Sequence, residues 1–307
     1  MREAYRVGMD SARALLSGVV DYAGLFPPAA LAMAEAVAEY ARAQRGQDAW
    51  MLGRFVLPAA RLPEFAEARA AATGGPDWRL SAIVRDGAAA DPASVAAFNA
   101  DPVRHRARVD TIECRPQALT GIDWLANVFG DAFDVYVEVA VGDDASDWLA
   151  RVAGRGLKAK VRTGGLSPEA FPAPAALLDF IGAAVRLKVP FKATAGLHHA
   201  VRGSYRLTDE PAAARAPMYG YLNVLLATAA LEAGLPASAA ERILRQTDAS
   251  TLRFSEASVR WADTELPASA LRATRQHRLV SFGSCSFRDP VDELRELPAS
   301  CLLPPNS

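Results

Sequence analysis

The sequence predicts an α/β protein built as a (β/α)8 barrel, and three observations support this prediction. The chain has 307 residues, a length that fits one α/β barrel as well as two smaller domains. A short β-branched run, a polar or glycine turn and an amphipathic Ala/Leu stretch follow one another eight times. No linker separates two domains. We therefore predict one TIM-type domain over residues 1–307, with an insertion at 236–277 before the last strand.

The expected strands are short and each precedes a helical stretch. They lie at residues 18–24, 53–59, 79–86, 108–116, 134–141, 157–165, 190–199 and 278–286. The helical stretches lie at 31–44, 63–72, 92–101, 121–130, 144–156, 168–187, 219–234 and 289–297. Residues 200–217 have little periodicity and read as a long loop. The insertion contains a helical piece at 237–246 and a possible extra strand at 252–261.

An open, doubly wound sheet is the alternative architecture, and it would bind a ligand where the strand order reverses. A dinucleotide or nucleoside triphosphate site in such a sheet needs a glycine-rich loop directly after a strand. Neither GxGxxG nor GxxxxGK[ST] follows any expected strand. The sequence therefore gives no support for either site, and we expect no cofactor.

The composition excludes several classes of partner. The net charge of −1 provides no electrostatic footprint for nucleic acid or an anionic membrane. No apolar run is long enough to cross a bilayer, and the first residues lack the order of a signal peptide. The three cysteines are widely spaced and odd in number, which argues against a disulfide framework. We expect a cytoplasmic protein that binds a small anionic metabolite, with the insertion as either a homo-oligomer surface or a cap.

The lysines are the most informative residues. All four, Lys158, Lys160, Lys188 and Lys192, fall within one 35-residue window, whereas the 30 arginines are spread over the chain. A desolvated lysine amine can lose its proton and attack a carbonyl, which a guanidinium cannot practically do. This clustering indicates the chemical centre of an enzyme, although a chance group of lysines on a solvated face is the alternative.

Alternation along the strands predicts which side chains point into the barrel. Lys158, Lys160 and Arg162 should face inward on one strand, and Lys192 and Thr194 on the next. The strand at 134–141 should send Tyr136 and Glu138 inward. The strand at 108–116 is ambiguous. The inward set there is either Asp110 with Ile112, or Thr111 with Glu113 and Arg115.

Several inward cations and carboxylates are costly to bury unless they pair, and Glu138 beside Lys160 is a plausible pair. One interpretation is a purely structural layer of ion pairs. The other is that Lys160 and Lys192 depress each other's pKa, because like charges and burial disfavour the charged form. One lysine would then be partly neutral and nucleophilic near pH 7.

Three segments resemble class I aldolases of the deoxyribose-phosphate aldolase type. Lys160-Val161-Arg162-Thr163-Gly164 is similar to a Lys-x-x-Thr-Gly motif, and Lys192-Ala193-Thr194-Ala195-Gly196 to a Lys-Ala-x-Gly-Gly-like motif. Val109-Asp110 is similar to a Val-Asp pair on an earlier strand. The resemblance covers roughly a tenth of the chain. It implies a barrel in which Lys160 forms a Schiff base, Lys192 lowers the pKa of its neighbour, and Asp110 relays protons.

Further candidates surround the expected mouth of the barrel. Guanidinium groups match carboxylate or phosphate oxygens, so arginines at strand ends indicate an anionic substrate. Histidines suit proton transfer near neutral pH, and hydroxyls after the last strand can bind phosphate. The candidate substrate-binding residues are Arg115, Arg162, Thr163, Thr194, His198, His199, Arg202, Ser284 and Ser286.

Two smaller alternatives involve the same region. His198 and His199 with Glu113 and Glu138 could form a divalent-metal site, but we assign no metal ligands. Cys285 could be a nucleophile, yet no histidine at a recognisable spacing accompanies it. DYAGLFPPA at 21–29 forms a turn in which Phe26 either lines the mouth or packs under the loop.

The sequence as a whole favours a Schiff-base lyase that acts on a small anionic carbonyl compound. The catalytic candidates are Lys160, Lys192, Asp110, Glu113 and Glu138. A second hypothesis is a non-covalent or metal-assisted isomerase or lyase. A third is a barrel that binds an anionic metabolite without turning it over.

Overall fold

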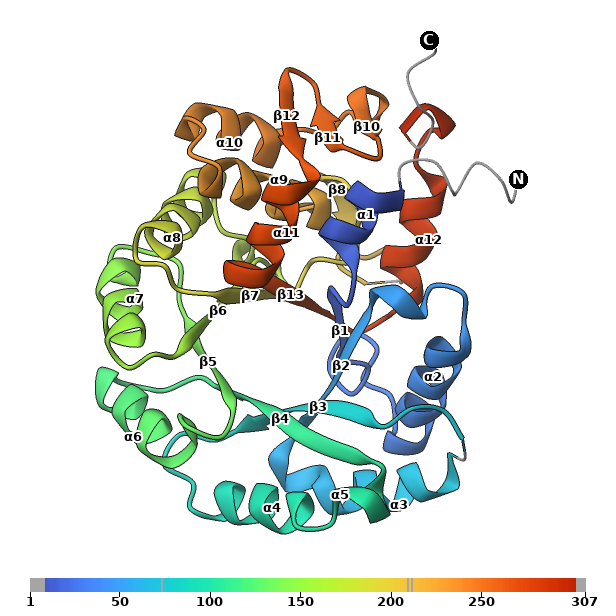
Figure 1. Ribbon diagram of the computed structural model, residues 1–307, viewed down its shortest axis with the longest axis vertical. Helices are drawn as coiled ribbons and strands as arrows, with labels where there is room; N and C mark the ends of the chain where they lie inside the picture. Colours follow the sequence, from blue (N-terminus) through green and yellow to red (C-terminus); the bar gives the residue numbers. More distant parts are fainter. Residues whose placement is uncertain (1–8, 73, 209, 211, 302–307) are drawn as a thin grey trace.

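A computed structural model describes residues 9–72, 74–208, 210 and 212–301, and these residues form a closed barrel of eight parallel strands. The barrel strands are β1 (Val20–Tyr22), β2 (Leu52–Pro58), β3 (Trp78–Val84), β4 (Ala107–Cys114), β5 (Asp134–Val139), β6 (Lys158–Arg162), β7 (Phe191–Thr194) and β13 (Leu279–Ser284). β1 pairs in parallel with both β2 and β13, which closes the barrel. Helices form an outer ring around it (Figure 1). The predicted fold class is therefore confirmed.

Twelve α-helices occur in the described part of the chain. They are α1 (Met9–Leu16), α2 (Met33–Arg45), α3 (Leu62–Ala71), α4 (Ala90–Asn99), α5 (Pro102–His105), α6 (Leu119–Phe129), α7 (Ala145–Gly154), α8 (Pro174–Arg186), α9 (Tyr221–Glu232), α10 (Ala237–Arg245), α11 (Ala268–His277) and α12 (Arg288–Glu296). None of the described helices is long and apolar enough to cross a membrane.

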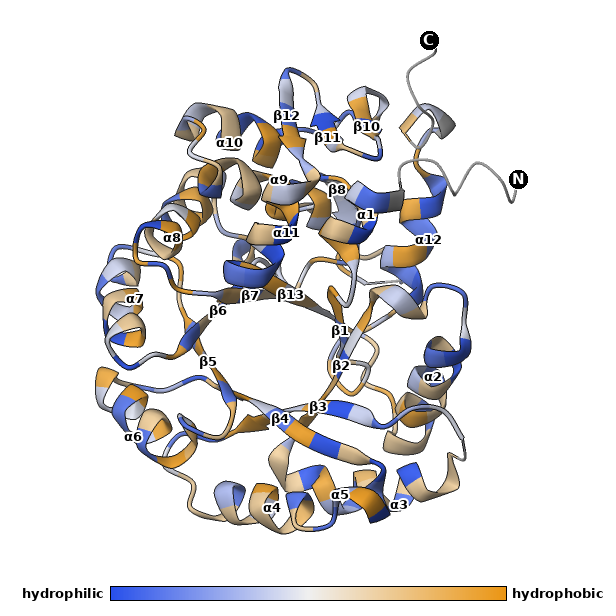
Figure 2. Cartoon of the chain, in the orientation of Figure 1, coloured by the Kyte–Doolittle hydropathy of each residue, from blue (hydrophilic) through white to orange (hydrophobic). Residues whose placement is uncertain are grey.

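Alternation along the strands separates two environments. Val135, Val137 and Val139 of β5 are buried in the hydrophobic core outside the barrel wall. Tyr136 and Glu138 point the other way, because the ammonium of Lys192 lies 5.6 Å from the Tyr136 ring and Glu138 pairs with Lys160. In Figure 2, hydrophilic segments interrupt the hydrophobic colouring of strands such as β4 and β5. Part of the barrel interior is therefore polar, as the inward lysines of β6 and β7 predict.

A register shift in β4 resolves the ambiguity of that strand. Leu80 pairs with Val109, but the next residue, Ser81, pairs with Thr111, so Asp110 is an extra residue in a β-bulge. Beyond the bulge, Glu113 faces the barrel interior, where Ser81 donates a hydrogen bond to its Oε1 at 2.7 Å. The set that includes Thr111 and Glu113 is the inward one.

The insertion covers a helix that has no polar face. Every residue from Tyr221 to Ala230 in α9 is buried, so both sides of this helix need apolar neighbours. The helix packs against α8, α10 and α11, and β12 (Thr264–Pro267) also contacts it. β12 belongs to an antiparallel sheet with β10 (Leu252–Phe254) and β11 (Ser258–Trp261). The predicted extra strand at 252–261 is thus two strands, β10 and β11, joined by a turn.

The segment at 200–217 is the other place where the prediction was wrong. Instead of an irregular loop, it contains an antiparallel hairpin of β8 (Gly203–Arg206) and β9 (Arg215–Met218). β8 alternates partly exposed with exposed positions and β9 alternates exposed with buried ones, but each strand has only four residues, too few for a periodic pattern to mark it. The hairpin follows β7 and brings Arg206 and Met218 to the mouth of the barrel.

Candidate functional site

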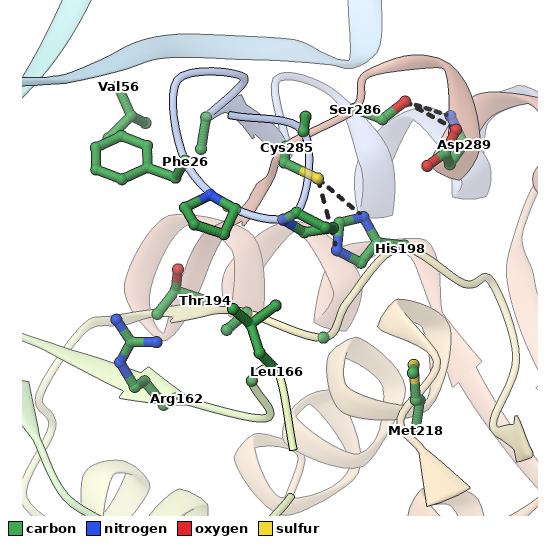
Figure 3. Close-up of a pocket in the computed structure, with 18 of the residues that line it drawn as sticks. Phe26, Val56, Arg162, Leu166, Thr194, His198, Met218, Cys285, Ser286 and Asp289 are labelled. Carbon is green, nitrogen blue, oxygen red and sulfur yellow. Dashed lines mark hydrogen bonds between the residues drawn. The ribbon is translucent and has the colours of Figure 1, made fainter. Parts of the chain in front are cut away.

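A cavity of about 770 Å³ opens at the carboxyl ends of the barrel strands. Its walls come from the loops that follow β1, β4, β6, β7 and β13 and from the β8–β9 hairpin. Figure 3 shows part of this cavity, with Phe26, Arg162, Leu166, His198 and Cys285 around it. In barrels of this kind, the carboxyl ends of the strands form the functional face. This cavity is therefore the candidate active site.

Lys192 occupies the most buried position of the cavity floor. Its ammonium lies 2.6 Å from Asp21 Oδ2 and 2.6 Å from Glu113 Oε1, and the residue is only 1% exposed. Burial alone would lower the pKa of Lys192, but the two carboxylates outweigh burial and raise it above its ordinary value. Lys192 therefore remains protonated. The prediction that the two lysines depress each other's pKa is wrong for Lys192. Its two carboxylate partners stabilise the protonated amine more strongly than burial and the neighbouring lysine destabilise it.

Asp21 is held in place by three neighbours. Besides Lys192, the hydroxyl of Ser281 donates to Oδ2 at 2.8 Å, and the backbone N–H of Arg54 donates to Oδ1 at 2.8 Å. Asp21 comes from the short β1, which has no alternation to mark an inward position. Sequence reasoning placed it at a strand end without assigning it a role. Its position beside Lys192 makes it part of the site.

Glu113 joins the two lysines. Its Oε1 accepts from Lys192 and Ser81, and its Oε2 lies 3.0 Å from the ammonium of Lys160. Burial would raise the pKa of this carboxyl, but Lys192 and Lys160 together hold it well below its usual range. Glu113 is therefore ionised, and it pairs with the ammonium groups of both Lys160 on β6 and Lys192 on β7.

Lys160 lies between two carboxylates on the cavity floor. Its ammonium is 3.0 Å from Glu113 Oε2 and 3.0 Å from Glu138 Oε2, and its side chain is 7% exposed. The parallel register places Lys160 directly opposite Glu138 of β5 and Lys192 of β7. The predicted pairing of Glu138 with Lys160 is confirmed. Lys160 also lines the cavity, so a ligand there can reach its amine.

Glu138 is shared between the floor and the mouth. Arg162 donates from Nε to its Oε1 at 2.9 Å, and Arg115 Nε lies 3.8 Å from the same oxygen. Burial would raise the pKa of Glu138, but Lys160 and Arg162 lower it below its ordinary value. The side chains of Arg115 and Arg162 are 70% and 54% exposed, and both residues line the cavity. They remain available to an anionic ligand.

Arg202, the third predicted arginine, does not line the cavity. Its guanidinium lies 4.8 Å from the centre of the Tyr219 ring, and its backbone N–H donates to Asn223 Oδ1. It therefore packs between the hairpin region and α9 rather than facing the substrate. Arg206, which sequence reasoning did not assign, lines the mouth instead.

The predicted hydroxyl residues divide between ligand-facing and structural positions. Thr194 and Ser286 line the cavity, and Ser286 also donates to Asp289 Oδ1 at 2.8 Å. Thr163 is fully buried, and its hydroxyl donates to the backbone carbonyl of Ala195 at 2.6 Å. It joins the ends of β6 and β7, so its predicted role in substrate binding is wrong. Ser284 is 2% exposed, and its Oγ lies 3.2 Å from His198 Nδ1.

The two adjacent histidines have different surroundings. His199 pairs through Nδ1 with Glu293 and stacks on Tyr205 with ring centres 3.4 Å apart. His198 lies beside Cys285, with Sγ 3.8 Å from Nδ1, and both residues line the cavity. No spacing in the sequence marks this pair, because the loops after β7 and β13 bring together residues that are far apart in the chain.

The divalent-metal alternative receives no geometric support from the described residues. No group of three or more His, Cys, Asp or Glu side chains in 9–72, 74–208, 210 and 212–301 is arranged to hold a metal ion. Glu113 and Glu138 bind lysines, whereas His199 binds Glu293.

Asp110 lies apart from the lysine cluster. Its Oδ1 is 2.6 Å from Arg54 Nε and its Oδ2 is 2.5 Å from Arg79 Nε. Arg54 also approaches Asp134 at 3.7 Å, and Lys158 pairs with Asp134 at 2.6 Å. These groups form a layer of ion pairs in the amino-terminal half of the barrel, and Asp110 does not line the cavity. The predicted role of Asp110 as a proton relay is therefore wrong, because the bulge turns it toward the arginines.

Two glycines after β6 and β7 make room for an aromatic ring. A Cβ on Gly164 would lie 2.4 Å from Cε1 of Phe171, and a Cβ on Gly196 would lie 2.8 Å from the same atom. The backbone at Gly196 also has a positive φ of 73°. The glycines in the two lysine motifs therefore allow Phe171 to pack onto both loops.

We expect a Gly164→Ala protein to be destabilised by about 1–3 kcal/mol, the usual cost of forcing an extra carbon into a packed site. The added methyl would displace the Phe171 ring. Urea denaturation measures this effect. A Gly154→Ala protein is the matched control, because a Cβ there meets nothing within 4 Å. Equal stability of the two variants would contradict the proposed packing role.

Comparison with known proteins gives only a distant match. No family model matches the chain, and no curated protein matches it. The solved structure of a lysine/ornithine decarboxylase from Vibrio vulnificus, complexed with cadaverine, is similar at 11% identity and a TM-score of 0.37. The match covers 63% of this chain and 48% of that chain, so it spans about half the length of the decarboxylase.

Proposed function

We propose that this chain is a lyase that forms a Schiff base between Lys160 and an anionic carbonyl substrate. The observation that carries the proposal is the position of the Lys160 amine, 3.0 Å from the carboxylates of Glu113 and Glu138 on the floor of the cavity. A nucleophilic lysine needs a nearby group that can accept its proton. Lys160 has two such groups and access to the cavity.

Glu138 is the better acceptor for the Lys160 proton. Glu113 is already bound by Lys192 and Ser81, so its negative charge is strongly stabilised. Glu138 is bound by Arg162, whose side chain is half exposed and can move toward a ligand. An anionic group that takes over Arg162 would leave Glu138 with one cation fewer, which raises its proton affinity. Substrate binding would thus favour transfer of the proton from Lys160 to Glu138.

The remaining steps follow from imine chemistry. The neutral amine of Lys160 adds to the carbonyl carbon, and the carbonyl oxygen leaves as water after it is protonated. The resulting iminium accepts the electron pair of the neighbouring carbon–carbon bond as that bond breaks. A base takes the proton from the hydroxyl of the departing fragment. Protonation of the enamine and addition of water then release the second fragment and return the amine.

Lys192 has an electrostatic role in this proposal. It stays protonated between Asp21 and Glu113, so it is a fixed positive charge below the reacting centre. The two carboxylates compensate this charge, so its role is to hold Glu113 ionised and in place beside Lys160. This role differs from the one that the aldolase resemblance implies for Lys192, whereas the assignment of Lys160 as the nucleophile is retained.

Borohydride reduction in the presence of small aldehydes, keto acids and sugar phosphates, followed by intact-mass spectrometry, tests the proposal. We expect a stable adduct on the native protein and none on a Lys160→Arg protein. Lys188→Arg is the matched control, since Lys188 is exposed and does not line the cavity. An adduct that survives in the Lys160→Arg protein would reject Lys160 as the nucleophile. No adduct with any carbonyl compound would reject the Schiff-base mechanism.

A second candidate function is non-covalent proton transfer, with Glu138 as the base and the lysines as stabilisers. The ion pairing of both lysines favours it, because carboxylate partners stabilise the ammonium form, which cannot act as a nucleophile. This function predicts exchange of substrate protons with deuterated water, without a reducible adduct. Exchange that persists in a Lys160→Arg protein, which keeps the positive charge but cannot form an imine, and is lost in a Glu138→Gln protein would distinguish it from the Schiff-base lyase.

A further inference from the structure

The outer half of the cavity differs chemically from its floor. The charged groups on the floor come from the barrel strands, but the loops above them contribute large apolar side chains. We call this set the apolar rim, and its members are Phe26, Leu31, Leu166, Phe171, Leu207 and Met218. They come from the loop after β1, the segment after β6, and the β8–β9 hairpin with the residue that follows β8. Three chain segments that are distant in sequence thus contribute apolar side chains to the same cavity.

Leu166 is the most exposed member of the rim. Its exposed fraction is 57%. Among the described residues, four other large hydrophobic side chains are exposed, namely Val103, Leu119, Val128 and Leu187, and none of these lines the cavity. Figure 3 shows Leu166 between Arg162 and His198, with Phe26 on the opposite side. An exposed leucine inside a concave site is a surface that an apolar ligand group would cover.

Packing and backbone hydrogen bonds hold several side chains of the apolar rim in place. Phe171 packs against Gly164 and Gly196, which fixes the ring between the loops that follow β6 and β7. Met218 is 4% exposed and lies in β9, whose pairing with β8 fixes its position. The backbone N–H of Phe26 donates to the carbonyl of Ala23, and the carbonyl of Phe26 accepts from Ala30. Ordered apolar groups of this kind bind without a large entropic cost.

We infer that the apolar rim is a subsite for a hydrocarbon extension of the anionic substrate. The inference rests on the proposed function, which places the anionic and carbonyl groups at Arg162 and Lys160. The cavity of about 770 Å³ lies within the range of roughly 300–1,000 Å³ that accommodates drug-sized ligands. A compound of three or four carbons would leave most of it unfilled. The substrate class is therefore an anion with an apolar chain rather than a small hydrophilic sugar derivative.

Calorimetric binding of straight-chain carboxylates, from propanoate to octanoate, tests the subsite without any imine chemistry, because these probes lack a carbonyl carbon that lysine can attack. We expect the dissociation constant to fall about fourfold for each added methylene group that is fully buried, which is the effect of burying one such group. In a Leu166→Asn protein, the gain per methylene should shrink, so octanoate binding should weaken more than propanoate binding.

A Leu187→Asn protein is the matched control, because Leu187 is also exposed but lies outside the cavity. It should keep the dependence on chain length. Binding that is independent of chain length, or that depends on it equally in the native and Leu166→Asn proteins, would overturn the subsite. Failure of borohydride trapping with retained chain-length dependence would instead reject the Schiff base alone. The two proposals can therefore fail separately.

Discussion

A Lys192→Met protein is expected to lose about 3–5 kcal/mol of unfolding free energy at pH 7, which is the usual cost of breaking a buried ion pair on one side. Lys192 is 1% exposed and lies 2.6 Å from both Asp21 and Glu113. Methionine has a similar length but carries no charge, so both carboxylates would remain buried without their cation. Urea denaturation followed by circular dichroism measures the change.

The matched control is a Lys188→Met protein, whose exposed lysine makes no ion pair in the described part of the chain. It should unfold at nearly the native urea concentration. A Lys192→Met, Asp21→Asn double variant should recover part of the loss, because one of the two unpaired charges is then absent. If Lys192→Met unfolds with the native midpoint, the lysine cannot be the counter-charge that this geometry indicates.

The free energy of unfolding is expected to be steady from neutral pH down to about pH 4.5 and to fall steeply below it. The pKa values of Glu113, Glu138 and Asp110 are all lowered in the folded protein. A carboxyl whose folded pKa lies below its unfolded value of about 4 stabilises the fold above that value. The stabilisation is lost as pH falls toward the folded pKa, because the unfolded chain binds the proton first.

Urea denaturation at intervals between pH 7 and pH 3 measures this dependence. Each of these carboxyls contributes a slope of at most about 1.4 kcal/mol per pH unit. An Asp110→Asn protein removes one of the three groups and should show a shallower slope. A Glu256→Gln protein is the control, since Glu256 is exposed and forms no ion pair in the described part of the chain, and it should give the native slope. Identical slopes in all three proteins would contradict the link between these ion pairs and acid stability.

The barrel and its lysine floor could be predicted because both depend on local periodicity. Each barrel strand is a β-branched run before a helical stretch, and alternation alone placed Lys160, Lys192 and Glu138 on one side of the wall. The parallel register then follows from the fold, because neighbouring strands of a closed barrel align their inward residues in layers. The pairing of Lys160 with Glu138 was predictable for this reason.

The remaining features depend on irregular backbone that a periodic pattern does not describe. The bulge at Asp110 shifts the parity of β4, so alternation could not choose between Asp110 and Glu113. The approach of His198 to Cys285 depends on the path of two loops. The direction of the Lys192 pKa depended on Asp21, which lies in a strand of three residues where no alternation can be read.

The layer of ion pairs below the cavity has a kinetic consequence for the proposed reaction. Tyr136 lies between the ammonium groups of Lys192 and Lys158, at 5.6 Å from each, and Arg54, Asp110 and Asp134 fill the barrel beneath it. These side chains close the barrel below the cavity, so molecules enter and leave through the opening at the carboxyl ends of the strands. In the proposed Schiff-base reaction the detached fragment would leave first through this opening, because the other fragment stays bonded to Lys160 until water releases it.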